Sequence, residues 1–143
     1  KKHDHSVDIL KYMFKLQITL ENIYGNDAVR WIRNTILMVP IVVMKFDKNL
    51  TVQNIPQEYN NKIKSIEFPT PIQDDKIWLS IYLKKISYLN DEQTTNYSFN
   101  TIENCLKLLG YSPLCINFPD WISQCKNETC EFYLKDNIGK FLR

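Results

Sequence analysis

Residues 99–118 constrain the fold most, because they contain a helix whose beginning and end are both marked by the sequence. Asn100 is a favoured N-cap residue, and Glu103, three positions later, completes a capping box. Gly110 has the conformational freedom to end the helix in a left-handed cap. We therefore predict a short helix here, followed by an extended run over 112–118. The apolar residues of this helix recur on one face with helical spacing: Ile102, Cys105, Leu106 and Leu109.

The composition allows one globular domain and excludes two classes of protein. With 143 residues, 44% of them hydrophobic, the chain can bury a core of its own. A formal net charge of +2 excludes a histone-like polycation but allows a local basic surface that binds nucleic acid. The longest apolar run, residues 36–44, contains Pro40 and is far shorter than the roughly 20 residues that span a bilayer. The opening residues are polar and contain no apolar segment typical of a signal peptide. Because we favour reduced thiols for the four cysteines, we expect an intracellular protein, cytoplasmic or nuclear, with no membrane partner.

The first forty residues contain two patterns. Between residues 10 and 20 every second position is apolar, which predicts a long half-buried strand. Gly25 interrupts this pattern, and Asn26 can cap a helix that begins at about Asp27 and ends near Leu37 or Met38. The apolar positions of the predicted strand are Leu10, Tyr12, Phe14, Leu16, Ile18 and Leu20.

Most of the remaining elements read as strands. Residues 41–46 and 50–55 are rich in β-branched side chains and flank a polar turn, which predicts a hairpin. A strong strand follows over 76–86, where apolar side chains alternate. The weaker predictions are a strand over 62–68, a polar loop over 90–97, an irregular segment over 119–127 and a final strand over 131–134.

This order of elements predicts an α+β fold. We expect a mostly antiparallel sheet with two helices on one face, followed by an extended linker with short strands. The predicted domain organisation is a flexible lead-in over 1–8, a folded domain over 9–110 and a linker-like segment over 111–143.

The sequence contains no recognisable catalytic or cofactor site. The two histidines, His3 and His5, have no further ligands nearby to complete a metal site. Asp74 and Asp75 lie in a predicted turn close to prolines, where solvated carboxylates are the simpler interpretation. The chain has no glycine-rich phosphate loop and no nucleophile beside a base. We therefore expect a segment that is not an enzyme and that holds neither a cofactor nor a metal.

The four cysteines leave two classes of protein open. All of them lie in the last third of the chain without a Cys-x-x-Cys pair, so a zinc knuckle is not expected. Reduced thiols are one interpretation, with Cys105 as a small buried hydrophobe. The alternative is a secreted recognition module held by disulfides, in which Cys125 and Cys130 bridge a hairpin. Three glycosylation sequons favour this alternative: Asn49, Asn96 and Asn127.

Basic residues recur at positions that we predict to lie on the surface. They fit either a solvated surface or a flank that contacts phosphates without reading bases. If the second interpretation holds, neutralising Lys84 and Lys85 should weaken duplex binding and flatten its salt dependence. The candidate nucleic-acid contacts are Arg30, Arg33, Lys45, Lys48, Lys84 and Lys85.

Three short motifs resemble the Argonaute family. The run Phe99-Asn-Thr-Ile-Glu before an apolar helix resembles the Phe-Glu-Thr-Ile-Gln-like start of the helix that ends the family's N domain. Tyr111-Ser-Pro-Leu resembles the Tyr-Thr-Pro-Val stretch that opens its first linker, and Glu131-Phe-Tyr-Leu resembles a strand of that linker. The predicted strand over 10–18 and the order of the elements after it also match. Cys115 and Ile116 replace the family's Gly-Arg, so the chain resembles a divergent member.

The resemblance implies an N domain over 9–110 and a first linker over 111–143, without the family's slicing domain. Its partners would be a small guide RNA or a guide–target duplex, the remaining domains of the parent chain, and a protein partner. The family's N domain acts as a wedge that helps to separate RNA duplexes in small-RNA-guided silencing. Two alternatives stay open: the secreted module, and a protein-docking domain of an Argonaute anchored by Trp31, Trp78 or Trp121.

Overall fold

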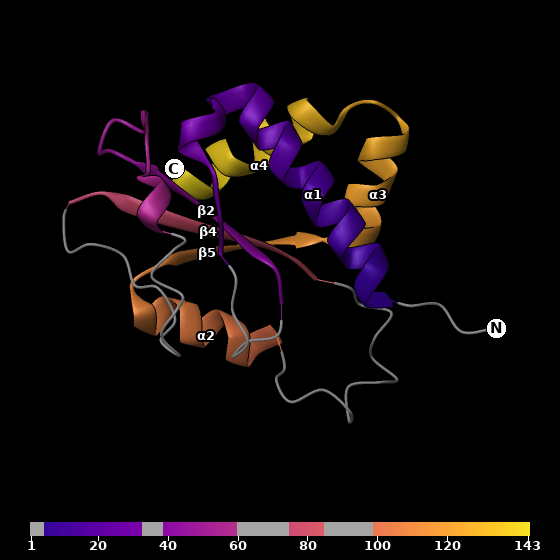
Figure 1. Ribbon diagram of the computed structural model, residues 1–143, viewed down its shortest axis with the longest axis horizontal. Helices are drawn as coiled ribbons and strands as arrows, with labels where there is room; N and C mark the ends of the chain where they lie inside the picture. Colours follow the sequence, from indigo (N-terminus) through magenta and orange to yellow (C-terminus); the bar gives the residue numbers. More distant parts are fainter. Residues whose placement is uncertain (1–4, 33–38, 60–74, 85–98) are drawn as a thin grey trace.

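The computed structural model describes residues 5–32, 39–59, 75–84 and 99–143. Within these residues the chain forms a mixed sheet with the strand order β1-β2-β4-β5, and β3 pairs with β2 (Figure 1). Neighbouring strands are antiparallel except for β4 and β5, which are parallel. The elements in chain order are α1 (His5–Tyr24), η1 (Asn26–Ala28), β1 (Arg30–Ile32), β2 (Ile41–Phe46), β3 (Val52–Gln53), η2 (Gln57–Tyr59), β4 (Ile77–Lys84), α2 (Phe99–Leu109), β5 (Ser112–Asn117), α3 (Phe118–Lys126) and α4 (Cys130–Leu142).

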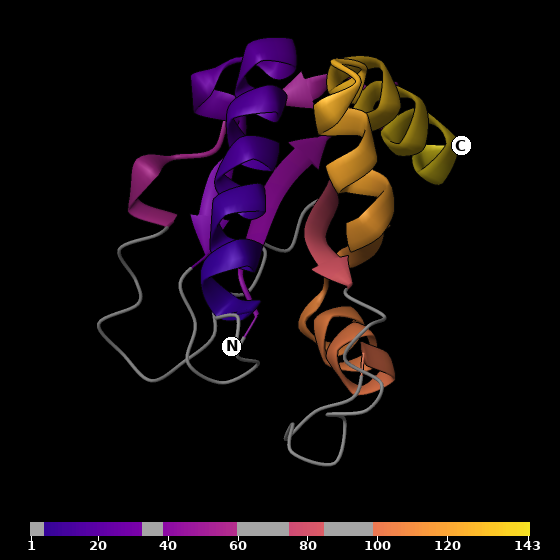
Figure 2. The same cartoon turned by 90° about the vertical axis from the view of Figure 1, so that its right-hand side faces the viewer.

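Helices cover both faces of this sheet. On one face α1, α3 and α4 pack over the strands, with Leu16, Ile81 and Trp121 in the shared core (Figures 1 and 2). On the other face lies α2, whose Leu106 packs in a second core with Tyr82 of β4. The predicted α+β class and the mostly antiparallel sheet are confirmed. The helices differ from the expectation in number and in lying on two faces rather than one.

Residues 5–24 form a helix, so the strand predicted between residues 10 and 20 is wrong. A period-two run of apolar residues also contains two period-four sets, and each set follows one face of a helix. Leu16 and Leu20, together with Met13, are fully buried against the sheet. The other set stays on the outside of the helix: Leu10, Phe14 and Ile18.

The helix predicted from Asp27 is wrong over the described part of that segment. Gly25 has a φ of 104° and leads into η1, a 3-10 helix of one turn. The chain then enters β1, where Trp31 lies opposite Val42 of β2. Bulky and β-branched residues favour such a pleated strand. Residues 33–38, the remainder of the predicted helix, lie outside the described residues.

Two helices replace the irregular segment and the final strand expected near the C-terminus. The side chain of Asn117 caps α3 by accepting a hydrogen bond from the backbone N–H of Asp120 at 3.0 Å. In α4, Leu134 and Ile138 lie one helical turn apart and are both buried. The strand predicted over 131–134 is therefore wrong, because Leu134 belongs to a helical pattern that continues beyond it.

Other predicted elements are confirmed with small changes at their ends. The hairpin forms, although β3 is shorter than the predicted 50–55. The strong strand corresponds to β4, and α2 and β5 follow as expected. Since α2 begins at Phe99, Asn100 lies inside its first turn and is not its N-cap. Gly110 ends the helix with a φ of 106°. The predictions over 62–68 and 90–97 lie outside the described residues.

Residues on both sides of the expected boundary at 110 share one core. Strand β5 pairs with β4 from Ser112, opposite Leu79, to Asn117, opposite Lys84. The indole N–H of Trp121 in α3 donates to the carbonyl oxygen of Tyr12 in α1 at 3.0 Å. The division into 9–110 and 111–143 stays a prediction, but residues 112–142 fold onto the sheet and its helices. The lead-in expected over 1–8 overlaps α1, which begins at His5.

Candidate nucleic-acid interface

Arg30, the first of the predicted contacts, has a structural role. Its side chain is only 10% exposed. The guanidinium donates to the carbonyl oxygens of Asn26 and Val29, both at 3.0 Å, and of Pro56 at 3.4 Å. It also lies 3.8 Å from the carboxylate of Asp27. These bonds join β1 to η1 and to the segment after β3, so Arg30 holds the chain together instead of facing a ligand.

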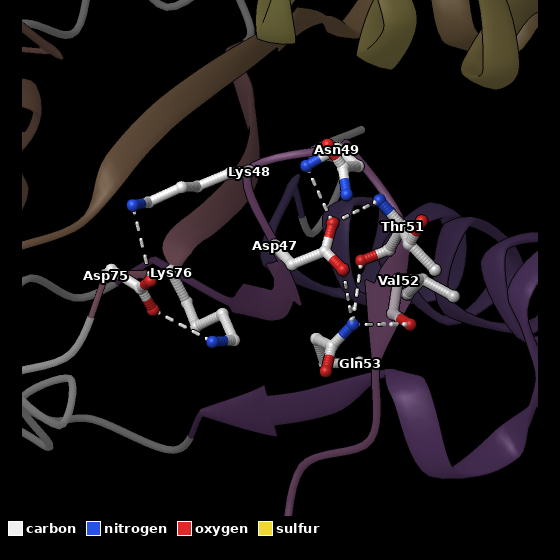
Figure 3. Close-up of polar contacts among 8 residues, drawn as sticks. All are labelled: Asp47, Lys48, Asn49, Thr51, Val52, Gln53, Asp75 and Lys76. Carbon is white, nitrogen blue, oxygen red and sulfur yellow. Dashed lines mark hydrogen bonds and ion pairs between the residues drawn. The ribbon is translucent and has the colours of Figure 1, made fainter.

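Two further predicted contacts, Lys45 and Lys48, lie at the β2–β3 hairpin, whose turn is held by Asp47 (Figure 3). The Asp47 carboxylate accepts hydrogen bonds from the backbone N–H groups of Asn49 and Thr51, both at 2.9 Å. It also accepts one from the side-chain amide of Gln53 at 3.3 Å. This fixed turn presents Lys48 towards the start of β4.

The hairpin lysines are compensated by neighbouring groups. Asp75 lies 3.6 Å from Lys48 and 2.8 Å from Lys76 (Figure 3). The hydrogen bond from Lys76 lowers the pKa of Asp75, so this carboxylate stays charged at neutral pH. The ammonium of Lys45 lies over the Trp78 ring, 4.9 Å from its centroid. Asp75 therefore neutralises part of the positive charge at this end of the sheet.

The remaining predicted contacts do not join the hairpin. Lys84 is exposed at the opposite end of β4, with its ammonium 5.7 Å from the centroid of the Phe99 ring. Arg33 and Lys85 lie outside the described residues. The described members of the predicted set therefore do not form one surface.

A different group of side chains combines positive charge with exposed rings. We call it the α1 outer face, and it consists of Leu10, Lys11, Phe14, Lys15 and Ile18, all of which are exposed. Lys11 and Lys15 lie one turn apart on this helix. Among the described residues, no carboxylate forms an ion pair with either lysine. Glu21, farther along the helix, accepts a hydrogen bond from Gln17 at 3.3 Å.

Phe14 is supported from the sheet by Trp31. The two rings are stacked, with their centroids 4.9 Å apart and their planes 11° from parallel. Trp31 is half-buried in β1, at the edge of the sheet, and packs against the core. Phe14 remains 53% exposed. A pair of flat rings beside two cations can bind phosphates and aromatic ligands together.

Sequence reasoning missed this face because the period-two pattern assigned Lys11 and Lys15 to one side of a strand and Phe14 to the other. A helix makes Lys11 a neighbour of both Phe14 and Lys15, since residues three and four apart lie side by side. The sequence does contain a sign of this face. Its apolar positions form two sets with a spacing of four, residues 12, 16 and 20 and residues 10, 14 and 18, and a helix needs only one such set to pack against a core.

The other candidate features of the sequence do not form a site in the described residues. Trp78 and Trp121 are buried, so neither is a surface anchor, whereas Trp31 is half-buried. All four cysteines are free thiols. Cys125 and Cys130 are in hydrogen-bond contact across the α3–α4 turn, and burial raises the pKa of Cys125 to about 11.

No group of three His, Cys, Asp or Glu side chains within the described ranges could hold a metal ion. Within those ranges, no helix combines the length and the apolar character needed to cross a membrane.

Comparisons with protein-family models, with curated proteins and with solved structures returned no match. Of the segments behind the Argonaute resemblance, the hairpin, the strand before residue 85 and the helix from Phe99 fold as expected. The segments over 10–18 and 131–134, which were matched to strands, are helical. The helix matched from Asp27 is replaced over its described part by η1 and β1.

Proposed function

We propose that this chain is a non-catalytic RNA-binding module whose contact surface is the α1 outer face. The observation that carries the proposal is the pair Lys11 and Lys15, one turn apart and exposed, with no ion-pairing carboxylate among the described residues. Lysines in this situation release counterions from a phosphate backbone on binding, which drives association without any reading of sequence. A formal net charge of +2 suits a protein that concentrates its positive potential on one face.

The choice of RNA as the ligand rests on the resemblance to Argonautes. The proposed function also has a narrower form, which follows that resemblance more closely. In that form the chain is an N domain with its first linker, acting as a duplex wedge in small-RNA-guided silencing together with the other domains of a parent protein. The helical structure of residues 10–18 and 131–134, and the replacement of the helix expected from Asp27 by η1 and β1, remove three of the matches behind this narrower form. The broader proposal of an RNA-binding module does not depend on them.

The test is RNA binding by a variant that lacks both lysines, Lys11→Gln/Lys15→Gln, measured by fluorescence anisotropy at several salt concentrations. A suitable control is Lys107→Gln/Lys140→Gln, which removes the same charge from two other helices. On single strands each neutralised phosphate contributes about 0.7 to the slope of log K against log salt. The α1 variant should therefore bind more weakly, with a slope reduced by about 1.4, whereas the control should behave like the wild type.

An α1 variant that matches the wild type in both affinity and slope would exclude the α1 outer face as the contact surface. Absence of RNA binding by the wild-type chain would reject the proposed function as a whole. In that case the exposed apolar side chains of α1 would favour the protein-docking alternative, which sedimentation analysis can examine.

A further inference from the structure

We infer that the α1 outer face binds unpaired nucleotides, with one base stacked on the Phe14 ring; this inference rests on the proposed function. Trp31 covers one side of Phe14 at a centroid distance of 4.9 Å, and about half of the Phe14 side chain, 53%, is exposed. A base that stacks on the open side would complete a row of three rings. Base–aromatic stacking of this kind is tolerant of sequence, because every base has a flat π-face.

The platform is held in position before any ligand arrives. Trp31 lies opposite Val42 in the β1–β2 pair, and its ring packs against the core beneath α1. On the helix side, Leu16 and Met13 anchor α1 to the sheet. Phe14 therefore has little freedom to lose on binding, which reduces the entropic cost of association.

The two cations lie on the same exposed face of α1 as the Phe14 ring. Lys11 precedes Phe14 by three positions and is its neighbour on the helix, whereas Lys15 lies one turn beyond Lys11, towards α3. Long lysine side chains can reach phosphates on either side of the base without a fixed geometry. The arrangement thus combines charge for the backbone with a ring for the base, as in general single-strand binding surfaces.

The apolar part of the same face argues against a duplex. Leu10 and Ile18 lie one turn to either side of Phe14 and are 40% and 52% exposed. In an A-form duplex the base faces are hidden in the stack, so these three apolar side chains would meet only sugars and phosphates. Unpaired bases offer flat apolar surfaces to all three. The expected ligand is therefore a single strand and not the duplex that a wedge would contact.

The experiment compares a labelled RNA of about ten nucleotides, within the usual site size of one single-strand-binding module, with a duplex of the same sequence. Phe14→Leu keeps an apolar side chain but removes the ring, and Phe132→Leu is the matched control at a ring on α4 that is 74% exposed. Both positions are exposed, so both variants should fold. Loss of one stacked base should weaken single-strand binding by about tenfold in Phe14→Leu. The control should bind like the wild type.

Trp31 provides an independent readout. The other two tryptophans, Trp78 and Trp121, are buried, so a change in tryptophan emission or in acrylamide quenching on adding the single strand would report mainly on Trp31. We expect RNA to protect Trp31 from acrylamide in the wild type and in Phe132→Leu.

The outcomes separate this inference from the proposed function. If Phe14→Leu binds the single strand as tightly as the wild type while the double lysine variant is weakened, the stacking inference is wrong and RNA binding stands. Equal affinity for duplex and single strand would also overturn it. A third outcome is that neither the wild type nor Phe14→Leu binds RNA, while the wild type self-associates and Phe14→Leu is monomeric. The α1 outer face would then be a protein interface, and both proposals would fail.

Discussion

At the scale of single residues, burial and hydrogen bonding decide which cations can act on a ligand. Arg30 and Lys48 were both predicted to contact nucleic acid from their charge alone. The structure buries Arg30 under three carbonyl oxygens and leaves Lys48 on the surface beside Asp75. The sequence alone does not show that Arg30 is buried and Lys48 exposed, because the burial of Arg30 depends on the contact between β1 and the segment after β3.

Replacing Arg30 by methionine should destabilise the fold by about 2–3 kcal/mol, because three carbonyl acceptors lose charged donors. The measurement is urea unfolding followed by circular dichroism. Lys48→Met removes one exposed charge and should change stability by less than about 0.5 kcal/mol. Equal midpoints for Arg30→Met and the wild type would show that Arg30 has no structural role.

The hydroxyl groups of Tyr59 and Tyr111 form a buried hydrogen bond, which makes stability depend on alkaline pH. Burial raises the pKa of Tyr59 from 10.0 to about 12 and raises the pKa of Tyr111 as well. Between pH 10 and about pH 12 the unfolded chain loses the proton of Tyr59, whereas the folded chain keeps it. Stability should therefore be complete below pH 10 and fall as the pH rises towards 12.

Urea midpoints measured across this range check the prediction. The variant Tyr59→Phe removes one of the two titrations, so its stability should fall less steeply with pH than that of the wild type. A wild-type midpoint that stays constant up to pH 12 would contradict the assigned burial of this pair.

At the scale of elements, the two largest differences from the sequence-based predictions are α1 and α4. In both, a short apolar pattern was compatible with a strand and with a helix. The length of the element distinguishes a helix from a strand, because strands are usually shorter than helices. Here α1 extends from His5 to Tyr24 and α4 from Cys130 to Leu142. By contrast, the helix from Phe99 and the strands around the hairpin were predicted correctly because glycine and turn residues mark their ends.

Two alanine substitutions distinguish the helix from the strand in α1. Positions 16 and 18 would lie on the same face of a strand, but in α1 Leu16 is buried and Ile18 is 52% exposed. Leu16→Ala should cost about 2–5 kcal/mol of unfolding free energy. Ile18→Ala should change it by less than about 0.5 kcal/mol. Equal losses at the two positions would be the result expected of a strand.

At the scale of the whole molecule, the class of fold followed from the sequence but the functional surface did not. The core of β2 and β4, with α2 against it, could be predicted from local patterns. The α1 outer face depends on Trp31 of β1 meeting Phe14 of α1, a contact between two elements that were both assigned to the wrong type. The same error hid Lys11 and Lys15, because they share one exposed face with Phe14 only on a helix.

The most direct test of RNA binding at this face is an NMR titration of the isotope-labelled chain with a short single-stranded RNA. We expect shifts in the backbone signals of Lys11, Phe14, Lys15 and Ile18 and in the indole signal of Trp31. The hairpin around Asp47 and the exposed end of β4 at Lys84 should remain unchanged. Shifts confined to the hairpin or to Lys84, with α1 unaffected, would show that RNA does not bind at the α1 outer face and would return the interface to the residues that charge alone suggests.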